Sequence, residues 1–385
     1  MTALKQVLVV CAIGLRTLPQ RGSTAIVIVV GTACVVGVLL SMLSVTVGMT
    51  RAFAAGGNAS RAIVRAQGTI REWGTGLSRE AVGTIMNAPG IASGPDGRPL
   101  ADAEMVMSLL PPEGLVQGSL QLRVFGPAGP AVHPAFKIVT GHMFRAGAQE
   151  VIVGVAAARR FGFAAGSKVV MPGGEWPIVG VFSSGGELLE SRFVADAETV
   201  LSAARLNGFS SVVAQLVDAN AYPAFEAWLT RNPALTVDVE RQTDFNASQA
   251  GREVQVFTRI SYGIGTIMAL GALFGAVKIM YAAVRARTRE IGMLRALGFG
   301  GAPVAASVLA ESMALSLAGA AIGAVIAWLA FDGREFYSWG AYQFRVPPAL
   351  VALGLAWGAA IAVLGGLSPA IRAARLTAVE ALRAA

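Results

Sequence analysis

The residues best suited to specific chemistry lie in one short basic segment, residues 285–301. Ile291, Leu294 and Leu297 recur at the spacing that places side chains on one face of a helix. The charged side chains around this apolar ridge are Arg287, Arg289, Glu290 and Arg295. A ridge of this kind suits docking into a groove on a partner protein. A solvated basic loop that only sets membrane topology would show the same periodicity, so the spacing leaves both interpretations open.

Glu311 is the one acidic residue inside a long apolar segment, residues 302–331. A carboxylate in hydrocarbon is costly unless it is paired or protonated, so intramembrane acids are functional candidates. Glu311 lies nearer the N-terminal end of this apolar segment, and that end directly follows residues 285–301. It could anchor that basic segment or relay protons, and its position alone does not decide between the two roles.

The chain has two histidines, His133 and His142, and two cysteines, Cys11 and Cys34. The histidines adjoin turn-like sequence without a cysteine or a carboxylate pair nearby, which favours ordinary surface residues over metal ligands. Both cysteines precede residue 51, so we expect the region after it to fold without disulfides or thiol-bound metal.

These residues are set among apolar segments long enough to cross a bilayer, which takes about 20 residues. Only 14% of the residues are charged, and mean hydropathy is +0.60. Soluble domains carry about 25% charged residues. The four predicted spans are residues 22–50, 260–284, 302–331 and 346–371. The first is too long for a cleaved signal peptide and is read as an uncleaved anchor. Two glycine pairs, Gly271 with Gly275 and Gly319 with Gly323, would allow close helix packing within one chain or between two.

Basic residues near the span ends predict the orientation. They gather before the first span, in residues 285–301 and in the tail 372–385, so both termini are predicted to be cytoplasmic. The region 51–259 and the short loop 332–345 are then external. Residues 1–21 have an amphipathic pattern that fits a helix on the inner leaflet, or else a plain lead-in to the span. Because the net charge of +8 follows the span ends, we expect no nucleic-acid binding.

The external region is predicted to be an α+β domain, because short β-like runs alternate with helical patterns and turn signals. The predicted strands are residues 61–67, 106–110, 120–125, 150–153, 168–171, 176–182 and 212–217. The predicted helices are residues 79–87, 155–161 and 221–230. Residues 241–257 are polar but compatible with a helix that runs into the second span.

Several motifs together resemble the FtsX/MacB-type (type VII) ABC transporter permeases. Residues 289–298, Arg-Glu-Ile-Gly-Met-Leu-Arg-Ala-Leu-Gly, are similar to the coupling-helix signature of that family, which includes Gly292. Residues 369–383 resemble its closing segment, and residues 141–144, 150–154 and 176–182 its external core domain. The resemblance covers nearly the whole chain in the family's order. It favours the anchor role for Glu311 and makes 285–301 an ATPase-coupling helix.

The resemblance implies a multi-pass subunit of the bacterial cytoplasmic (inner) membrane, with a MacB-type periplasmic core. It would work as a dimer with a second permease copy or a paralogue, driven by a separate cytoplasmic ABC ATPase. Residues 162–168, Gly-Phe-Ala-Ala-Gly-Ser-Lys, are the nearest approach to a phosphate-binding loop and have the wrong order. We therefore expect no enzyme activity and no cofactor in this chain, with ATP and Mg bound by the partner.

The function implied is export or extraction of a lipid, lipoprotein, peptide or toxic amphiphile by mechanotransmission. Membrane lipid and a periplasmic adaptor or lipoprotein are further candidate partners. The alternative is an FtsX-like signalling permease that regulates a cell-wall hydrolase. A receptor or ion-coupled transporter is disfavoured, because inverted repeats and broken helices with paired charges are not evident.

Overall fold

A computed structural model of the chain describes residues 6–7, 10–12, 22–69, 76–109, 120–337 and 341–376. The chain forms two compact units. Unit 1 comprises Met1–Val47, Gln255–Arg334 and Phe344–Ala385, and unit 2 comprises Gly48–Val254 and Glu335–Gln343. Of the predicted N-terminal helix 1–21, residues 6–7 and 10–12 are helical, and the rest lies outside the described residues, as does 377–385 of the tail.

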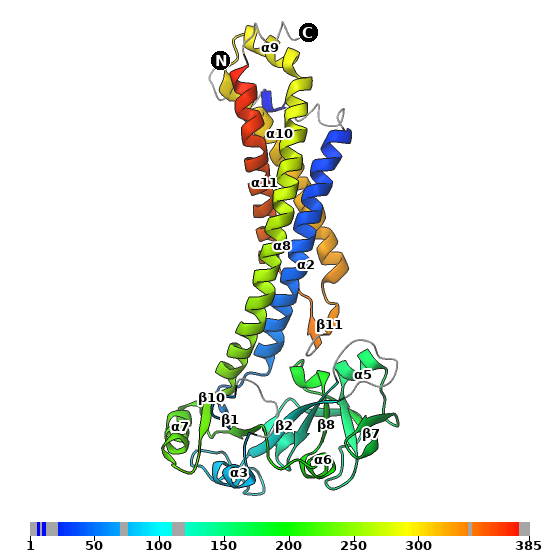
Figure 1. Cartoon of the computed structure of the whole chain (residues 1–385), viewed down its shortest axis with the longest axis vertical. Helices are drawn as coiled ribbons and strands as arrows, with labels where there is room; N and C mark the ends of the chain where they lie inside the picture. The colour runs from blue at the N-terminus through cyan, green and yellow to red at the C-terminus, as the bar shows by residue number, and fades with distance from the viewer. Residues whose placement is uncertain are drawn as a thin grey trace. The chain divides into compact units, whose positions relative to one another are not determined.

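Four long helices are apolar enough to cross a membrane (Figure 1). They are α2 (Gly22–Ala55), α8 (Gln242–Ala286), α10 (Gly301–Phe331) and α11 (Pro348–Arg375). Long apolar runs form helices because this satisfies every backbone hydrogen bond within the segment. The predicted fold class, four membrane helices with an α+β domain, is confirmed. The helical run predicted at 241–257 is also confirmed, because α8 continues through it without a break.

Small residues set the packing of the helices in unit 1. A Cβ at Gly319 or Gly323 of α10 would collide with backbone atoms of Val29 or Ala33 on α2. The second glycine pair is different, because Gly271 and Gly275 of α8 face no described atom within 4 Å. The first pair therefore packs within the chain, and the second lies on an open face of α8.

The loop predicted at 332–345 contains a short hairpin. Strands β11 (Glu335–Tyr337) and β12 (Ala341–Gln343) pair antiparallel. Residues 335–343 belong to unit 2, whereas the flanking residues belong to unit 1.

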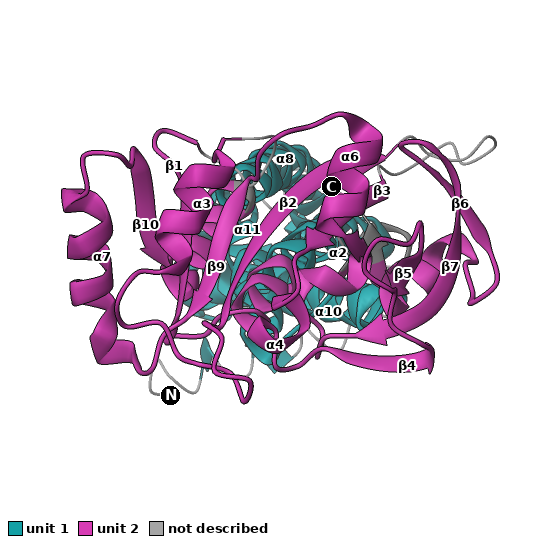
Figure 2. Ribbon diagram, turned by 90° about the horizontal axis from the view of Figure 1, so that it is seen from below, with its two compact units in different colours: residues 1–47, 255–334, 344–385 teal, residues 48–254, 335–343 magenta. Residues whose placement is uncertain are grey.

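Unit 2 is built on one mixed ten-stranded sheet in the order β10-β1-β9-β2-β3-β8-β5-β7-β4, with β6 paired to β7 (Figure 2). Most neighbours are antiparallel, but β3 with β8 and β5 with β7 are parallel. The strands are β1 (Arg61–Ala66), β2 (Ala101–Leu109), β3 (Leu120–Phe125), β4 (Lys137–Gly141), β5 (Val151–Gly154), β6 (Lys168–Met171), β7 (Gly174–Ser183), β8 (Phe193–Asp196), β9 (Ser211–Gln215) and β10 (Val237–Arg241).

Short helices connect the strands of unit 2. They are α3 (Arg79–Met86), α4 (Gly129–Val132), α5 (Val155–Phe161), α6 (Ala197–Ala204), α7 (Tyr222–Arg231) and the 3-10 turns η2 (Leu188–Ser191) and η3 (Ala219–Ala221). The main core includes the fully buried Trp176, Phe193 and Phe225. A second cluster contains Phe125 and Phe182. The apolar surface buried in these two cores stabilises the sheet of unit 2.

Candidate functional site

The predicted coupling segment forms a separate short helix, α9 (Thr288–Ala296). Arg287 has φ −103° and ψ 8°, so it interrupts the helical path between α8 and α9. At the other end, the Phe299 N–H donates to the Leu294 carbonyl at 3.1 Å and the Gly298 N–H donates to the Arg295 carbonyl at 3.1 Å. With Gly298 at φ 88°, this is a Schellman stop that favours glycine.

Arg287 is tied to Glu311 by a buried ion pair. Its Nη1 donates to Glu311 Oε2 at 2.7 Å, and both residues are buried. A buried charge pair of this kind is strongly destabilised when one partner is removed. The pair links the joint between α8 and α9 to α10, which is the contact that the anchor interpretation of Glu311 requires.

The structure divides the predicted ridge of α9. Ile291 is only 5% exposed and packs with Val284, Val304 and Val308 of the same chain. Leu297, in contrast, is 77% exposed. Met293, a residue outside the predicted ridge, is 50% exposed. The expectation that Ile291 enters a partner's groove therefore needs correction. Helical spacing identifies residues that share a face, but it does not say what covers that face.

The remaining predicted residues of the segment have different surroundings. Gly292 is buried, whereas Arg289 and Glu290 are exposed. Leu294 is partly buried, and Arg295 donates through Nη1 to the Phe299 carbonyl at 3.3 Å. Beneath the helix lies a cavity of about 50 Å³, with Glu290, Leu294 and the Arg287–Glu311 pair in its lining. This volume is enough for a few water molecules, at roughly 10–15 Å³ for each.

Unit 2 holds a buried charged cluster that the sequence analysis missed. Arg123 donates to Glu104 on the adjacent strand, and His133 Nε2 lies 3.0 Å from the other carboxylate oxygen of Glu104. Arg61 Nη1 lies 3.3 Å from His133 Nδ1. Because arginine can only donate, Nδ1 must accept and Nε2 must carry the hydrogen that Glu104 accepts. His133 is thus buried between Arg61 and Glu104, which corrects its assignment to the surface. His142 is exposed as predicted.

The pKa values of the two carboxyl groups of β2 are shifted in opposite directions. Burial alone would raise the pKa of Glu104, but Arg123 and His133 outweigh it and hold that pKa at about 2. Burial and the charge of Glu104 raise the pKa of Asp102 well above its ordinary value, although Asp102 accepts the Gly126 N–H at 2.8 Å. Charged residues within otherwise apolar strands are the sequence signal that could have revealed this cluster: Arg61 in β1, Asp102 and Glu104 in β2, and Arg123 in β3. Among the described residues, no group of three or more His, Cys, Asp or Glu is placed to hold a metal ion.

Comparison with known families decides the assignment. The family described as MacB-like periplasmic core domain matches residues 22–232, which is more than half of the chain. The family described as FtsX-like permease C-terminal matches residues 262–378. This chain belongs to the FtsX/MacB-type ABC transporter permeases. The permease is therefore a membrane component of the ABC class, and α9 lies within its FtsX-like part.

Several characterised and uncharacterised proteins share segments with this permease. It is 35% identical over 140 residues to the pyoverdine export ATP-binding/permease protein PvdT of Pseudomonas savastanoi pv. phaseolicola, a match covering 36% of this chain and 21% of that protein. It is 32% identical over 138 residues to the uncharacterized ABC transporter permease YknZ of Bacillus subtilis, covering 36% of this chain and 34% of that protein. The macrolide export ATP-binding/permease protein MacB of Chromobacterium violaceum is 34% identical over 109 residues, covering 28% of this chain and 17% of that protein.

Each of these matches therefore spans about a third of the relative's length or less. Among solved structures, the extracellular domain of the noncanonic ABC-type transporter YknZ from Gram-positive bacteria is similar with a TM-score of 0.36 and 15% identity. That match covers 47% of this chain and 99% of the solved chain.

Proposed function

We propose that this permease is the membrane subunit of an ABC export system and that a separate cytoplasmic ATPase drives it through α9. The observation that carries the proposal is the division of α9 into an anchored face and an exposed face. Ile291 and the Arg287–Glu311 pair attach the helix to α10 and α8, while Met293 and Leu297 remain exposed. A partner that binds the exposed face can push or pull on a helix that is already fixed to two spans.

The proposed transmission runs along α8. This helix is continuous from Gln242, directly after strand β10, to Ala286, directly before α9. A helix of 45 residues transmits displacement because its hydrogen-bonded backbone is stiff along its axis. Movement imposed on α9 would thus reach the first turn of α8 in unit 2. The exported species would be a lipid, lipoprotein, peptide or toxic amphiphile.

The remaining assignments are part of the same proposal. The partner would bind the ATP and Mg, and a second permease copy would pack on the open α8 face around Gly271 and Gly275. The protein would lie in the bacterial inner membrane with both termini in the cytoplasm. Two of the matched relatives are named as export proteins, which supports export over the signalling alternative.

The test changes the exposed face of α9 and measures binding of the ATPase that copurifies with the permease. Met293→Asp and Leu297→Asp each remove an apolar contact worth roughly 1.5–3 kcal/mol and bury a charge, so affinity should fall at least about tenfold. Thr288→Asp is the matched control, because an acidic residue in the first turn of a helix is tolerated. Unchanged ATPase binding by both Met293→Asp and Leu297→Asp would show that the helix does not dock there.

Ile291→Asp serves as a second comparison in the same assay. Because Ile291 is buried against its own chain, this change should act by lowering the stability of the purified permease and not by removing a contact with the ATPase. The wild-type permease without its partner is expected to show no ATP turnover.

A further inference from the structure

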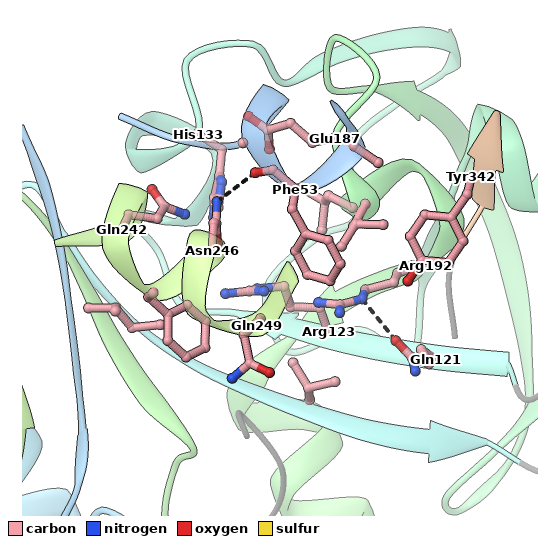
Figure 3. Close-up of a pocket in the computed structure, with 17 residues that line it drawn as sticks. Phe53, Gln121, Arg123, His133, Glu187, Arg192, Gln242, Asn246, Gln249 and Tyr342 are labelled. Carbon is pink, nitrogen blue, oxygen red and sulfur yellow. Dashed lines mark hydrogen bonds between the residues drawn. The ribbon is translucent and has the colours of Figure 1, made fainter. Parts of the chain in front are cut away.

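Unit 2 contains an open pocket of about 140 Å³ next to the buried charged cluster (Figure 3). A volume of this size holds roughly ten water molecules, so it can take the headgroup of a larger molecule or a small organic ligand. Its walls come from the end of α2, the start of α8, strands β1 to β3, the end of α4, the turn η2 with its flanking residues, and strand β12. The pocket therefore lies where the two helices that continue into unit 1 meet the sheet.

Two guanidinium groups line the same wall of this pocket. Strands β3 and β8 pair in parallel with Arg123 opposite Val194, so Arg192 is a diagonal neighbour of Arg123 on the same face of the sheet. Arg192 Nε donates to Gln121 Oε1 at 3.0 Å, which holds its side chain along this wall. Figure 3 shows both guanidinium groups beneath the ring of Phe53.

Among the described residues, the charged groups in or directly behind the pocket include the arginines Arg61, Arg123 and Arg192 and the carboxyl groups of Glu104 and Glu187. Glu104 is occupied by Arg123 and His133. Burial raises the pKa of Glu187 from its ordinary value. An anion entering this site would lie beside the guanidinium groups of Arg123 and Arg192.

Gln242 supplies an independent sign of a polar ligand. It lines the pocket and is only 9% exposed, yet its side-chain oxygen has no hydrogen-bond partner among the described residues. Buried polar atoms are almost always satisfied, so an orphaned one facing a pocket calls for a partner. Because the two ends of a glutamine amide are interchangeable by rotation, this group can donate to an oxyanion or accept from a hydroxyl.

Apolar and aromatic side chains also line the pocket. They are Phe53 from α2, Phe245 from α8, Tyr342 from β12 and Leu188 from η2. The guanidinium of Arg65 lies 4.6 Å from the centre of the Phe245 ring and supports that ring from behind. Pockets that combine such walls with a few convergent polar groups are typical of ligand sites.

We propose that this pocket binds the oxyanion headgroup of an amphiphile, a phosphate or carboxylate that carries an apolar chain or ring. Arg192 and Arg123 hold the oxyanion, Gln242 completes its hydrogen bonds, and the aromatic wall holds the apolar part. The bound molecule contacts α2, α8 and the sheet at once. This binding does not depend on the proposed ATP-driven export, because it requires neither nucleotide nor ATPase.

The experiment titrates hexyl phosphate into the full-length permease, purified in dodecyl maltoside, by isothermal calorimetry without ATPase or nucleotide. Saturable one-to-one binding is expected. Arg192→Gln should weaken it about tenfold, the size expected for one charge-assisted contact, and Gln242→Met severalfold. Arg98→Gln, at an exposed turn outside the pocket, is the matched control and should bind as the wild type does.

Arg192 is chosen over Arg123 because replacing Arg123 would leave Glu104 buried without its cation. Thermal unfolding of each variant, and retention of most binding by Arg192→Lys, separate a lost contact from a lost fold. Inorganic phosphate and hexanol are titrated as partial ligands, and each should bind much more weakly than hexyl phosphate. Equal binding of hexyl phosphate by wild type, Arg192→Gln and Gln242→Met would overturn the site. Equal binding of inorganic phosphate would overturn its amphiphile specificity.

Discussion

At the scale of single residues, two buried ion pairs organise this permease. Arg287 with Glu311 joins α9 to α10 in unit 1, and Arg123 with Glu104 joins β3 to β2 in unit 2. Each pair removes two charges from solvent, so the geometry of the pair decides its effect on stability. Glu311 is stabilised in an apolar helix because Arg287, at the break between α8 and α9, reaches back to it.

The Arg287–Glu311 pair predicts a specific pattern of mutant stabilities. Glu311→Leu and Arg287→Met should each destabilise the purified permease by about 3–5 kcal/mol, because each leaves one buried charge alone. The double variant should lose less than either single variant, since no charge remains unpaired. Thermal unfolding in detergent measures this, with Glu290→Gln as the exposed control. Additive losses in the double variant would mean that the two side chains do not act as a pair.

At the scale of elements, α9 is short and is defined by its two ends. Arg287 interrupts the path from α8, and the Gly298 stop releases the chain toward α10 at Gly301. Its nine residues are too few to be stable alone in water, so packing of Ile291 against α8 and α10 holds the helix. The exposed residues Met293 and Leu297 therefore lie on a helix that α8 and α10 hold in place.

The Gly298 stop can be tested by one substitution. Gly298→Val forces a β-branched side chain into a left-handed conformation that costs about 1–2 kcal/mol. The end of α9 should then fray or change direction, which displaces Leu297 and weakens ATPase binding. Gly300→Ala, where the backbone is extended, is the control. Crosslinking of the ATPase to a cysteine at Leu297 reports the change, and undiminished crosslinking in Gly298→Val would contradict the role of this stop.

At the scale of the whole molecule, the chain leaves unit 1 for unit 2 within α2 and returns within α8. The hairpin β11–β12 makes a second, shorter excursion into unit 2. Unit 2 is thus assembled from two separate stretches of sequence, and its pocket uses residues from both. We expect changes in α2 or α8 to affect the sheet domain because both helices contribute to it.

The proposed membrane orientation predicts which residues are accessible from outside the cell. In a chain whose Cys11 and Cys34 have been replaced, an impermeant thiol reagent applied to intact cells with a permeabilised outer membrane should label a cysteine at Ser167. It should not label one at Thr288, because the basic residues around α9 favour the cytoplasmic side. After lysis both positions should react. Labelling of Thr288 but not Ser167 in intact cells would reverse the topology.

The sequence by itself determined the features that depend on neighbouring residues along the chain. Long apolar runs predicted the four membrane helices, and short β-like runs predicted β3 and β6 with their observed bounds. Strands β4, β8 and β10 were not predicted, and β4 is a largely exposed edge strand.

Only the tertiary structure decided what covers each face. Spacing placed Ile291 and Leu297 on one ridge, but α8 and α10 bury the first and leave the second exposed. His133 is buried because Glu104 and Arg61, which are distant in sequence, converge on it. The periodicity of side chains is a local property of the backbone, whereas burial and charge pairing depend on which distant segments meet.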